Sequence, residues 1–376
     1  MMLRAAALAA VLCFLTVAAP RECVPAPSAE LNTYHRYVAA GSELLQKGDY
    51  RGARDAFDEA LRYADTDVAA YLGLGIAALH LKDETTAERS FRRAVELNPR
   101  EKEALVMLGE LALRRDDLET AAGYWERALE LDPRDGMLKA RLERIRREHR
   151  TEKDFNRDLT GHFSAKYEGR ERIEAGRIVL RMLETAYGEI GRALSFYPDR
   201  EIAVILYSDK QFREVTDAPG WSGGIYDGKI RIPIGGIEQE TPSLRRLLFH
   251  EYTHAAVRAL TPRVPTWLNE GLAQHFEGRV TAEGERQMLR RAQQDGRLPP
   301  LSLLEGSFLG LGGAQAGHAY LVSLSAVQYM IDQFGMYRVR MVLDELAAGS
   351  NTDRAVQNGL LVSFDDFERG WRRSLE

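Results

Sequence analysis

Residues 71–99 read YLGLGIAALHLKDETTAERSFRRAVELNP, and the same pattern recurs once before and once after this stretch at a constant interval. Each copy has a glycine, an alanine, an aromatic residue and a second alanine at fixed spacing. These positions are Gly41, Gly75 and Gly109; Ala53, Ala87 and Ala121; Phe57, Phe91 and Trp125; Ala60, Ala94 and Ala128. Glycine and alanine let two antiparallel helices approach closely, and the aromatic ring fills the wedge between them. The period therefore predicts a stack of helix pairs over residues 33–135.

The pattern closely resembles the tetratricopeptide repeat. Pro99 and Pro133 end the second and third copies, and Asp65 takes that place in the first. The segment that follows, residues 136–154, resembles the extra helix that caps such arrays. The resemblance implies an all-α array that binds peptides or partner proteins. The alternative is a spacer or docking surface without a peptide groove.

Length and composition favour two soluble domains. The chain has 376 residues, 45% of them hydrophobic and 28% charged, which is enough for real cores. The formal net charge is −5, because 51 basic residues are outweighed by 56 acidic ones. This balance gives no sign of nucleic-acid binding.

The N-terminus predicts export. A short positive start, MMLR, precedes the apolar run AAALAAVLCFLTVAA over residues 5–19, which is short for a membrane span. Residues 1–29 are therefore expected to be a signal peptide, for which the sequence offers several cleavage positions, or an uncleaved anchor. The protein would then be periplasmic or extracellular, with no other membrane span. The only cysteines, Cys13 and Cys23, lie in or near this segment, so cysteine ligands are excluded from any metal site.

From residue 155 the pattern changes to mixed strands and helices. HFSAKYEG and EIAVILYS read as strands on either side of a long amphipathic helix, and WSGGIYDGKIRIP as a hairpin. A helix is expected over 242–260 and another between Pro265 and Gly278. The remainder, 281–376, predicts four or five helices. Residues 155–376 are thus expected to form an α+β domain.

Two histidines in FHEYTHAAVRALTPRVPTWLNEGLAQHF, residues 249–276, lie four positions apart on a predicted helix. His250 and His254 therefore share a face and can bind one metal ion. Glu251 lies about 100° round the helix, where a carboxylate can take a proton from an attacking water. A catalytic zinc needs a third protein ligand, and Glu270 follows His254 after a proline-punctuated turn, where a second helix can double back.

The string WLNEGLA closely matches the third-ligand helix of gluzincin metallopeptidases. Over residues 160–340 the chain resembles the gluzincin-type, peptidase MA-like domains of the zincin fold that often follow tetratricopeptide repeats. The resemblance implies one zinc ion per chain bound by His250, His254 and Glu270, with Glu251 as general base. It also implies peptide or protein substrates.

The resemblance leaves three features open. Gluzincins often place a carboxylate one turn beyond the third ligand to orient a histidine, and here that residue is Gln274, with Glu277 nearby. A Tyr or His stabilises the oxyanion in these enzymes, and Tyr320 is the first candidate here, with His318 second. Gly223 and Gly224 would let an extended substrate approach an edge strand.

The sequence thus predicts an exported zinc peptidase with an N-terminal repeat array. One alternative is a scaffold whose repeats recruit partners and whose zinc domain is catalytically silent. Another is a zinc hydrolase that acts on some other amide.

Overall fold

The structure is a computed structural model that describes residues 29–169, 172–216, 223–234 and 237–376. The chain divides into two compact units. We call the described residues up to Arg150 the repeat unit, and Thr151–Glu376 the sheet unit. All but the last residue of the expected signal or anchor, 1–29, lies outside the described residues. Within the described ranges, no helix is long and apolar enough to cross a membrane.

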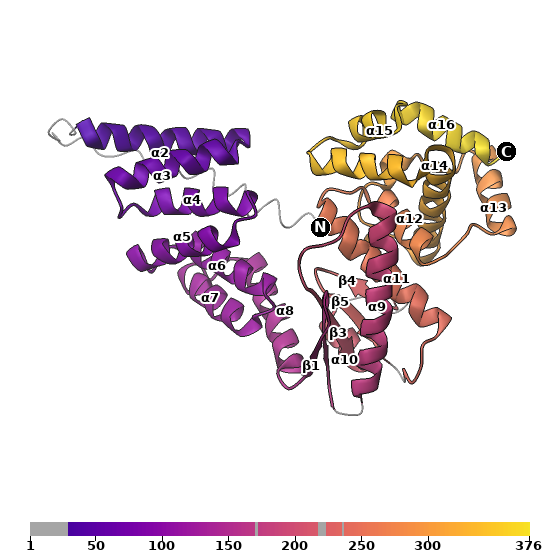
Figure 1. Cartoon of the computed structure of the whole chain (residues 1–376), viewed down its shortest axis with the longest axis horizontal. Coiled ribbons are helices and arrows are strands. Elements are labelled where there is room, and N and C mark those ends of the chain that lie inside the picture. The colour runs from indigo at the N-terminus through magenta and orange to yellow at the C-terminus, as the bar shows by residue number, and fades with distance from the viewer. Residues whose placement is uncertain (1–28, 170–171, 217–222, 235–236) are drawn as a thin grey trace. The chain divides into compact units, whose positions relative to one another are not determined.

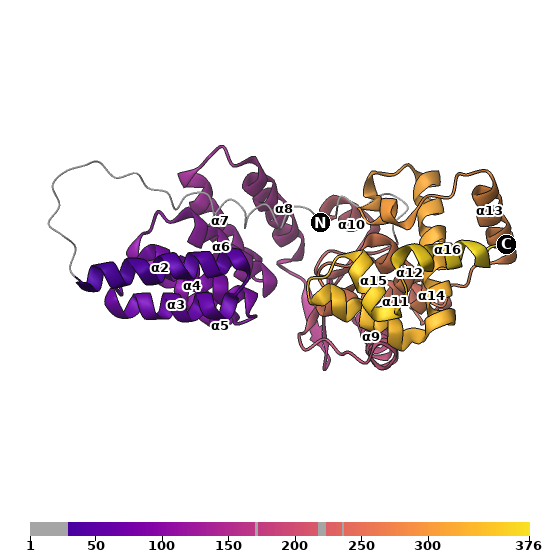
Figure 2. The same cartoon turned by 90° about the horizontal axis from the view of Figure 1, so that it is seen from above.

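The repeat unit consists of helices that stack in chain order (Figures 1 and 2). They are α2 (Ala29–Lys47), α3 (Tyr50–Tyr63), α4 (Val68–His80), α5 (Glu84–Leu97), α6 (Lys102–Arg114), α7 (Leu118–Leu131) and α8 (Gly136–Glu152). The pairs α2–α3, α4–α5 and α6–α7 correspond to the three copies of the sequence pattern, and α8 follows as the expected extra helix. The predicted helical array is confirmed.

The repeated glycines and aromatic residues meet as the sequence pattern requires. Phe91 and Trp125 are fully buried. A Cβ atom on Gly75 would lie 2.6 Å from the Phe91 ring, and one on Gly109 would lie 2.2 Å from Trp125 Nε1. Only glycine lets the ring of one helix lie directly on the backbone of its partner.

A left-handed residue links the two helices of each pair. Gly48, Lys82 and Asp116 occupy the same position in successive copies and have φ values of 77°, 62° and 61°. Glycine adopts this conformation freely, whereas a residue with a Cβ is strained by about 1–2 kcal/mol. The turn geometry is therefore kept in all three pairs although only the first pair has the residue best suited to it.

The sheet unit contains a mixed five-stranded sheet in the order β1-β2-β3-β5-β4. Its strands are β1 (Asn156–Leu159), β2 (Phe163–Tyr167), β3 (Ile202–Tyr207), β4 (Ile225–Tyr226) and β5 (Ile230–Pro233). The central strands β2, β3 and β5 are parallel, and the outer strands β1 and β4 pair antiparallel with their neighbours. The short strand β4 is thus one edge of the sheet, beside the helix that carries the histidines.

Helices cover both faces of this sheet. Helices α9 (Ile173–Leu194) and α11 (Pro242–Leu260) pack on the face that presents Phe163, Val204 and Ile232. Helix α10 (Asp209–Val215) lies on the other face. Strand β1 and helix α10 were not predicted, since a four-residue strand with three polar residues and a seven-residue helix give no clear periodicity.

The rest of the sheet unit is helical, as the sequence predicts. Its elements are α12 (Thr266–Phe276), α13 (Glu283–Gln294), the 3₁₀ turns η2 (Leu301–Leu304) and η3 (Phe308–Gly310), α14 (Gly313–Ala347), α15 (Thr352–Leu360) and α16 (Phe364–Ser374). Gly335, with φ at 80°, kinks α14. Helices α11, α12 and α14 pack against one another and bring the candidate site residues together.

Candidate metal centre

Helices α11 and α12 form a hairpin whose ends are set by the local sequence. The Thr241 side chain caps α11 by accepting from the backbone NH of Leu244, and Pro242 occupies the first turn. Thr261 ends α11 in an extended conformation, and α12 begins after Pro265. This short connection brings the first turns of α12 back onto the second half of α11.

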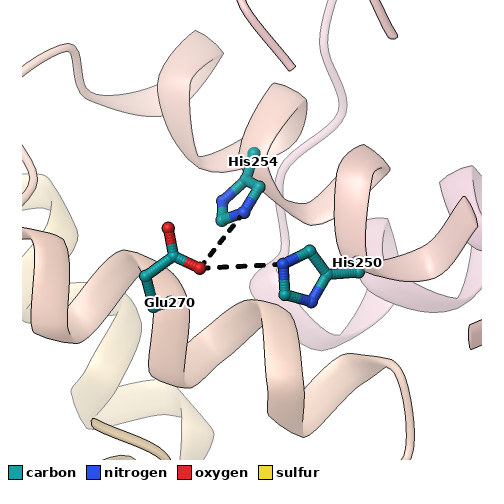
Figure 3. Close-up of side chains that lie close together, drawn as sticks. All are labelled: His250, His254 and Glu270. Atoms are coloured by element: carbon teal, nitrogen blue, oxygen red, sulfur yellow. Dashed lines mark ion pairs between the residues drawn. The ribbon is translucent and has the colours of Figure 1, made fainter. Parts of the chain in front are cut away.

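The hairpin brings the three predicted ligands together (Figure 3). Glu270 Oε2 lies 3.6 Å from His250 Nε2 and 3.5 Å from His254 Nε2. The three ligand atoms lie within 4.8 Å of one another. In a tetrahedral zinc site, ligand atoms at the usual metal distances are about 3.3 Å apart. The observed separations are close to that value.

The bonding of Glu270 also fits a metal ligand. Its Oε2 atom is buried and has no hydrogen-bond partner among the described residues. A buried carboxylate oxygen without a partner is costly unless a cation binds it. The side chains of His250, His254 and Glu270 are 19%, 12% and 15% exposed, so the cluster keeps an opening. Two imidazoles, one carboxylate and an open position are the donor set of a catalytic zinc site.

The three side chains also shift one another's pKa values. Burial favours the neutral form of His250, but the neighbouring carboxylates of Glu270 and Glu277 overcome this and raise its pKa to about 10. For Glu270, burial acts in the opposite direction, yet the neighbouring His254 and His250 lower its pKa well below the usual range. Without a metal, the cluster therefore attracts protons. A divalent cation would supply the same positive charge.

Glu251 lies beneath the end of the edge strand. Its side chain is 5% exposed, and burial raises the pKa of its carboxyl group. A Cβ atom on Gly224, directly before β4, would lie 3.2 Å from Glu251 Oε1 and 3.0 Å from Leu247 Cδ1. Gly224 therefore lets the backbone pass directly over Glu251. Gly223 is exposed, and among the described residues a Cβ there would meet only Leu247, at 3.5 Å.

Comparisons with known proteins agree with this arrangement. A model of the Peptidase MA superfamily matches residues 197–376, and a tetratricopeptide repeat model matches residues 38–88 and 85–136. The chain carries tetratricopeptide repeats followed by a Peptidase MA superfamily domain. The fold class expected from the sequence is thereby confirmed, and members of the superfamily of the second domain are typically zinc-dependent. No curated protein matches the chain.

Solved structures match the repeat unit at low similarity. The first TPR domain of human RPAP3 is 23% identical, with a TM-score of 0.29, and the match covers 31% of this chain and 91% of that one. The Yersinia enterocolitica type III secretion chaperone SycD, in complex with a YopD peptide, is 20% identical with a TM-score of 0.28. That match covers 31% of this chain and 88% of SycD.

Within the peptidase MA domain, Tyr320 is the oxyanion candidate whose hydroxyl is coupled electrostatically to the carboxylates of the candidate site. Burial raises the pKa of its hydroxyl, and the charges of Glu270 and Glu251 raise it further. The Tyr320 ring packs edge-on against Phe308, with centroids 5.5 Å apart. For His318, burial is the one cause of its lowered pKa, with no contribution from the site carboxylates among the described residues. This electrostatic coupling favours Tyr320.

The carboxylate that orients a histidine comes from Glu277. His250 Nδ1 lies 2.8 Å from Glu277 Oε2, so this carboxylate accepts the Nδ1–H and the Nε2 atom is left facing Glu270. Gln274, at the position where gluzincins often have the carboxylate, instead bonds to backbone carbonyls of α12 and α14. Arg279, which sequence reasoning missed, donates to Gln274 Oε1 at 2.8 Å. No sequence signal singles out this arginine.

Proposed function

We propose that the sheet unit is a zinc-dependent peptidase in which Glu251 acts as general base. The observation that carries this proposal is the buried Oε2 of Glu270, which has no hydrogen-bond partner in the described part of the chain and lies opposite the Nε2 atoms of His250 and His254. The peptidase MA match over residues 197–376 supports the same reading.

A zinc ion held by His250, His254 and Glu270 would polarise the scissile carbonyl and lower the pKa of a water toward about 7. Glu251 takes the proton from the attacking water and passes it to the leaving amine. Its burial favours this role, because a carboxylate with a raised pKa is a stronger base. The Tyr320 hydroxyl donates to the oxygen on which negative charge develops.

Strand β4 is proposed as the substrate edge. It pairs with β5 on one side and ends the order of described strands, and Gly224 directly precedes it over Glu251. An extended peptide can pair with such an edge through its main chain. The scissile bond would then lie across the opening above the three ligands.

The test is the Glu251→Gln variant, compared with the wild type on a diverse peptide library read by mass spectrometry. Metal analysis should give about one zinc per chain in both proteins, since Glu251 is not a ligand. Turnover should fall by about 10²–10⁴-fold, because general-base catalysis is lost. Unchanged turnover would rule out Glu251 as the base. A folded protein that binds no zinc would rule out the site.

The repeat unit is proposed to bind a peptide or protein partner. The first helices of its pairs carry half-buried apolar side chains at the edges of the cores, including Leu72 and Ile76 on α4. If the chain is instead a catalytically silent scaffold, Glu251→Gln leaves the cellular phenotype intact, whereas Leu72→Ser with Ile76→Ser removes it. If the chain is a peptidase, Glu251→Gln alone removes the phenotype.

Export is proposed from the residues that precede the described structure. MMLR followed by fifteen apolar or small residues is typical of a signal peptide or an N-terminal anchor. Cell fractionation with N-terminal sequencing tests both forms. Recovery of the whole protein in the cytosol would contradict export, and an intact Met1 on exported protein would assign the anchor.

A further inference from the structure

Helices α12 and α14 meet in direct backbone contact. A Cβ atom on Gly271 would lie 2.5 Å from the Ser323 carbonyl oxygen and 2.4 Å from Val327 Cγ2. Glu270 adjoins this contact on α12, and Tyr320 lies one turn before it on α14. The position of α14 against α12 therefore decides where the Tyr320 side chain lies relative to the third metal ligand.

Gln274, one turn beyond Gly271 on α12, stabilises the same contact between α12 and α14 through hydrogen bonds. Its side chain is 2% exposed. Its Nε2 atom donates to the Tyr320 carbonyl oxygen at 2.8 Å and to the Glu270 carbonyl oxygen at 3.2 Å. A single amide thus bonds to the backbone of both the oxyanion candidate and the third ligand.

Arg279 fixes which way this amide faces. Its Nη1 atom donates to Gln274 Oε1 at 2.8 Å, and its Nη2 atom donates to Glu285 Oε1 at 2.7 Å. Because the amide oxygen is held by the guanidinium, the amide nitrogen must face the two carbonyls. Flipping the amide would break all three bonds of Gln274 at once.

A carboxylate at position 274 could not make this contact. An ionised carboxylate only accepts hydrogen bonds, so it could still bind Arg279 but would turn a bare oxygen toward the Tyr320 carbonyl. The usual reason for a carboxylate at this position, to orient a histidine, is met here by Glu277. A carboxylate is therefore not needed at position 274, and a side chain that donates a hydrogen bond can occupy it.

We propose that Gln274 is a positioning residue for Tyr320: its amide, oriented by Arg279, holds α14 against α12 and thereby fixes the place of the Tyr320 side chain relative to Glu270. This inference rests on the proposed peptidase function. Gluzincins often have a carboxylate at the position of Gln274, where it orients a metal ligand. In this protein Gln274 would instead align the helices α12 and α14.

A double-mutant cycle with Gln274→Glu and Tyr320→Phe tests the assignment in the zinc-loaded full chain. Tyr320→Phe should lower kcat by about 10²–10³-fold, as loss of an oxyanion donor does. Gln274→Glu should lower kcat by about 10–100-fold, with KM within about threefold, because a displacement near 1 Å has that cost. The double variant should be no worse than Tyr320→Phe, since Gln274 acts through Tyr320. Additive losses would overturn the proposal.

Zinc affinity, measured by competition with a chelator, is the second readout. It should change by less than about threefold in Gln274→Glu, because the carboxylate that orients His250 is Glu277. A loss of about tenfold or more, the range typical of a residue that orients a ligand, would assign Gln274 to the metal instead. If Gln274→Glu does not fold, Gln274→Met removes the same two bonds to carbonyls without adding a charge.

Gln328→Met is the matched control. Gln328 lies two turns beyond Tyr320 on α14, donates to the Arg279 carbonyl at 3.1 Å and accepts from Thr281 Oγ1 at 2.6 Å. Its loss should lower the melting temperature about as much as Gln274→Met does, while kcat stays within about twofold. Equal losses of kcat in both variants would show that general loosening, and not the alignment of Tyr320, is responsible.

Failure of the proposed peptidase function can be told apart from failure of the positioning role of Gln274. If Glu251→Gln hydrolyses peptides as fast as the wild type, the peptidase proposal fails whatever Gln274 does. The crystal structure of Gln274→Glu then decides the positioning role alone. A Tyr320 side chain displaced away from Glu270 supports that role, and an unmoved Tyr320 overturns it.

Discussion

In the repeat unit each glycine of the pattern faces an aromatic side chain, whereas in the sheet unit Gly271 faces the backbone of α14. A Cβ on Gly109 would meet the rim of the Trp125 indole, and one on Gly271 would meet the Ser323 carbonyl oxygen. A side chain can move aside at moderate cost, but a helix backbone moves only as a whole. The first contact stabilises a stack, and the second also fixes the alignment of two helices at a site.

The two units also differ in how far the ion pairs compared here are buried. The Glu43–Lys47 ion pair of the repeat unit is more than 60% exposed on both sides, and such pairs contribute little to stability. In the sheet unit, His250, Glu270 and Glu277 pair where water is largely excluded. Buried polar groups are costly unless every partner is in place. Packing therefore stabilises the repeats, whereas the buried polar contacts around His250 define a site in the sheet unit.

Glu277 is the position in these two units where we expect a substitution to have the greatest consequence. Glu277→Gln removes the charge that holds His250 Nδ1–H, so zinc affinity should fall by about 10–100-fold. Chelator competition on the full chain measures this. Glu43→Gln, which removes an exposed charge of the repeat unit, is the control and should leave zinc affinity unchanged. Equal zinc affinity in the wild type and Glu277→Gln would mean that Glu277 does not orient the ligand.

The repeats, and the meeting of His250, His254 and Glu270, could be predicted from the sequence because each signal is local. Three copies of one pattern predict the array, and an i, i+4 histidine pair followed by Glu270 predicts that these three side chains meet, as they do. That they bind a metal stays a prediction. The partner of His250 could not be chosen between Gln274 and Glu277, since both follow Glu270 on the same side of α12. The difference arises because Gln274 faces α14 while Glu277, just past the end of α12, faces His250.

Packing within the repeats should show the next largest effect. Gly109→Ala forces a methyl group against Trp125 Nε1, and overpacking of this kind costs about 1–3 kcal/mol. Gly123→Ala on α7 is the matched control, because a Cβ there meets no atom of the described residues within 4 Å outside its own helix backbone. That change should stabilise the helix by up to about 1 kcal/mol. Hydrogen exchange of residues 102–135 measures both. If Gly109→Ala left the stability of the repeat unit unchanged, the Trp125 indole would have to move aside freely.

The smallest expected effect is a pH dependence at Glu101 in the repeat unit. Burial, together with a hydrogen bond and repulsion from Glu103, raises the pKa of Glu101 to about 7. The folded chain then keeps a proton that the unfolded chain loses near pH 4.5. The stability from this group is therefore fully present below about pH 4.5 and is lost as the pH rises through 7.

Because Glu101 is partly exposed, the loss after solvent screening should stay below about 1 kcal/mol. Hydrogen exchange of α6 at several pH values in low salt measures it. Glu101→Gln should flatten the dependence, and Glu103→Gln should reduce it by removing the repulsion. A slope that persists in Glu101→Gln would place the titrating group elsewhere. If the stability of the repeat unit depended on pH as steeply as expected for a fully buried carboxylate, a charge in the repeat unit would affect stability as much as one in the sheet unit.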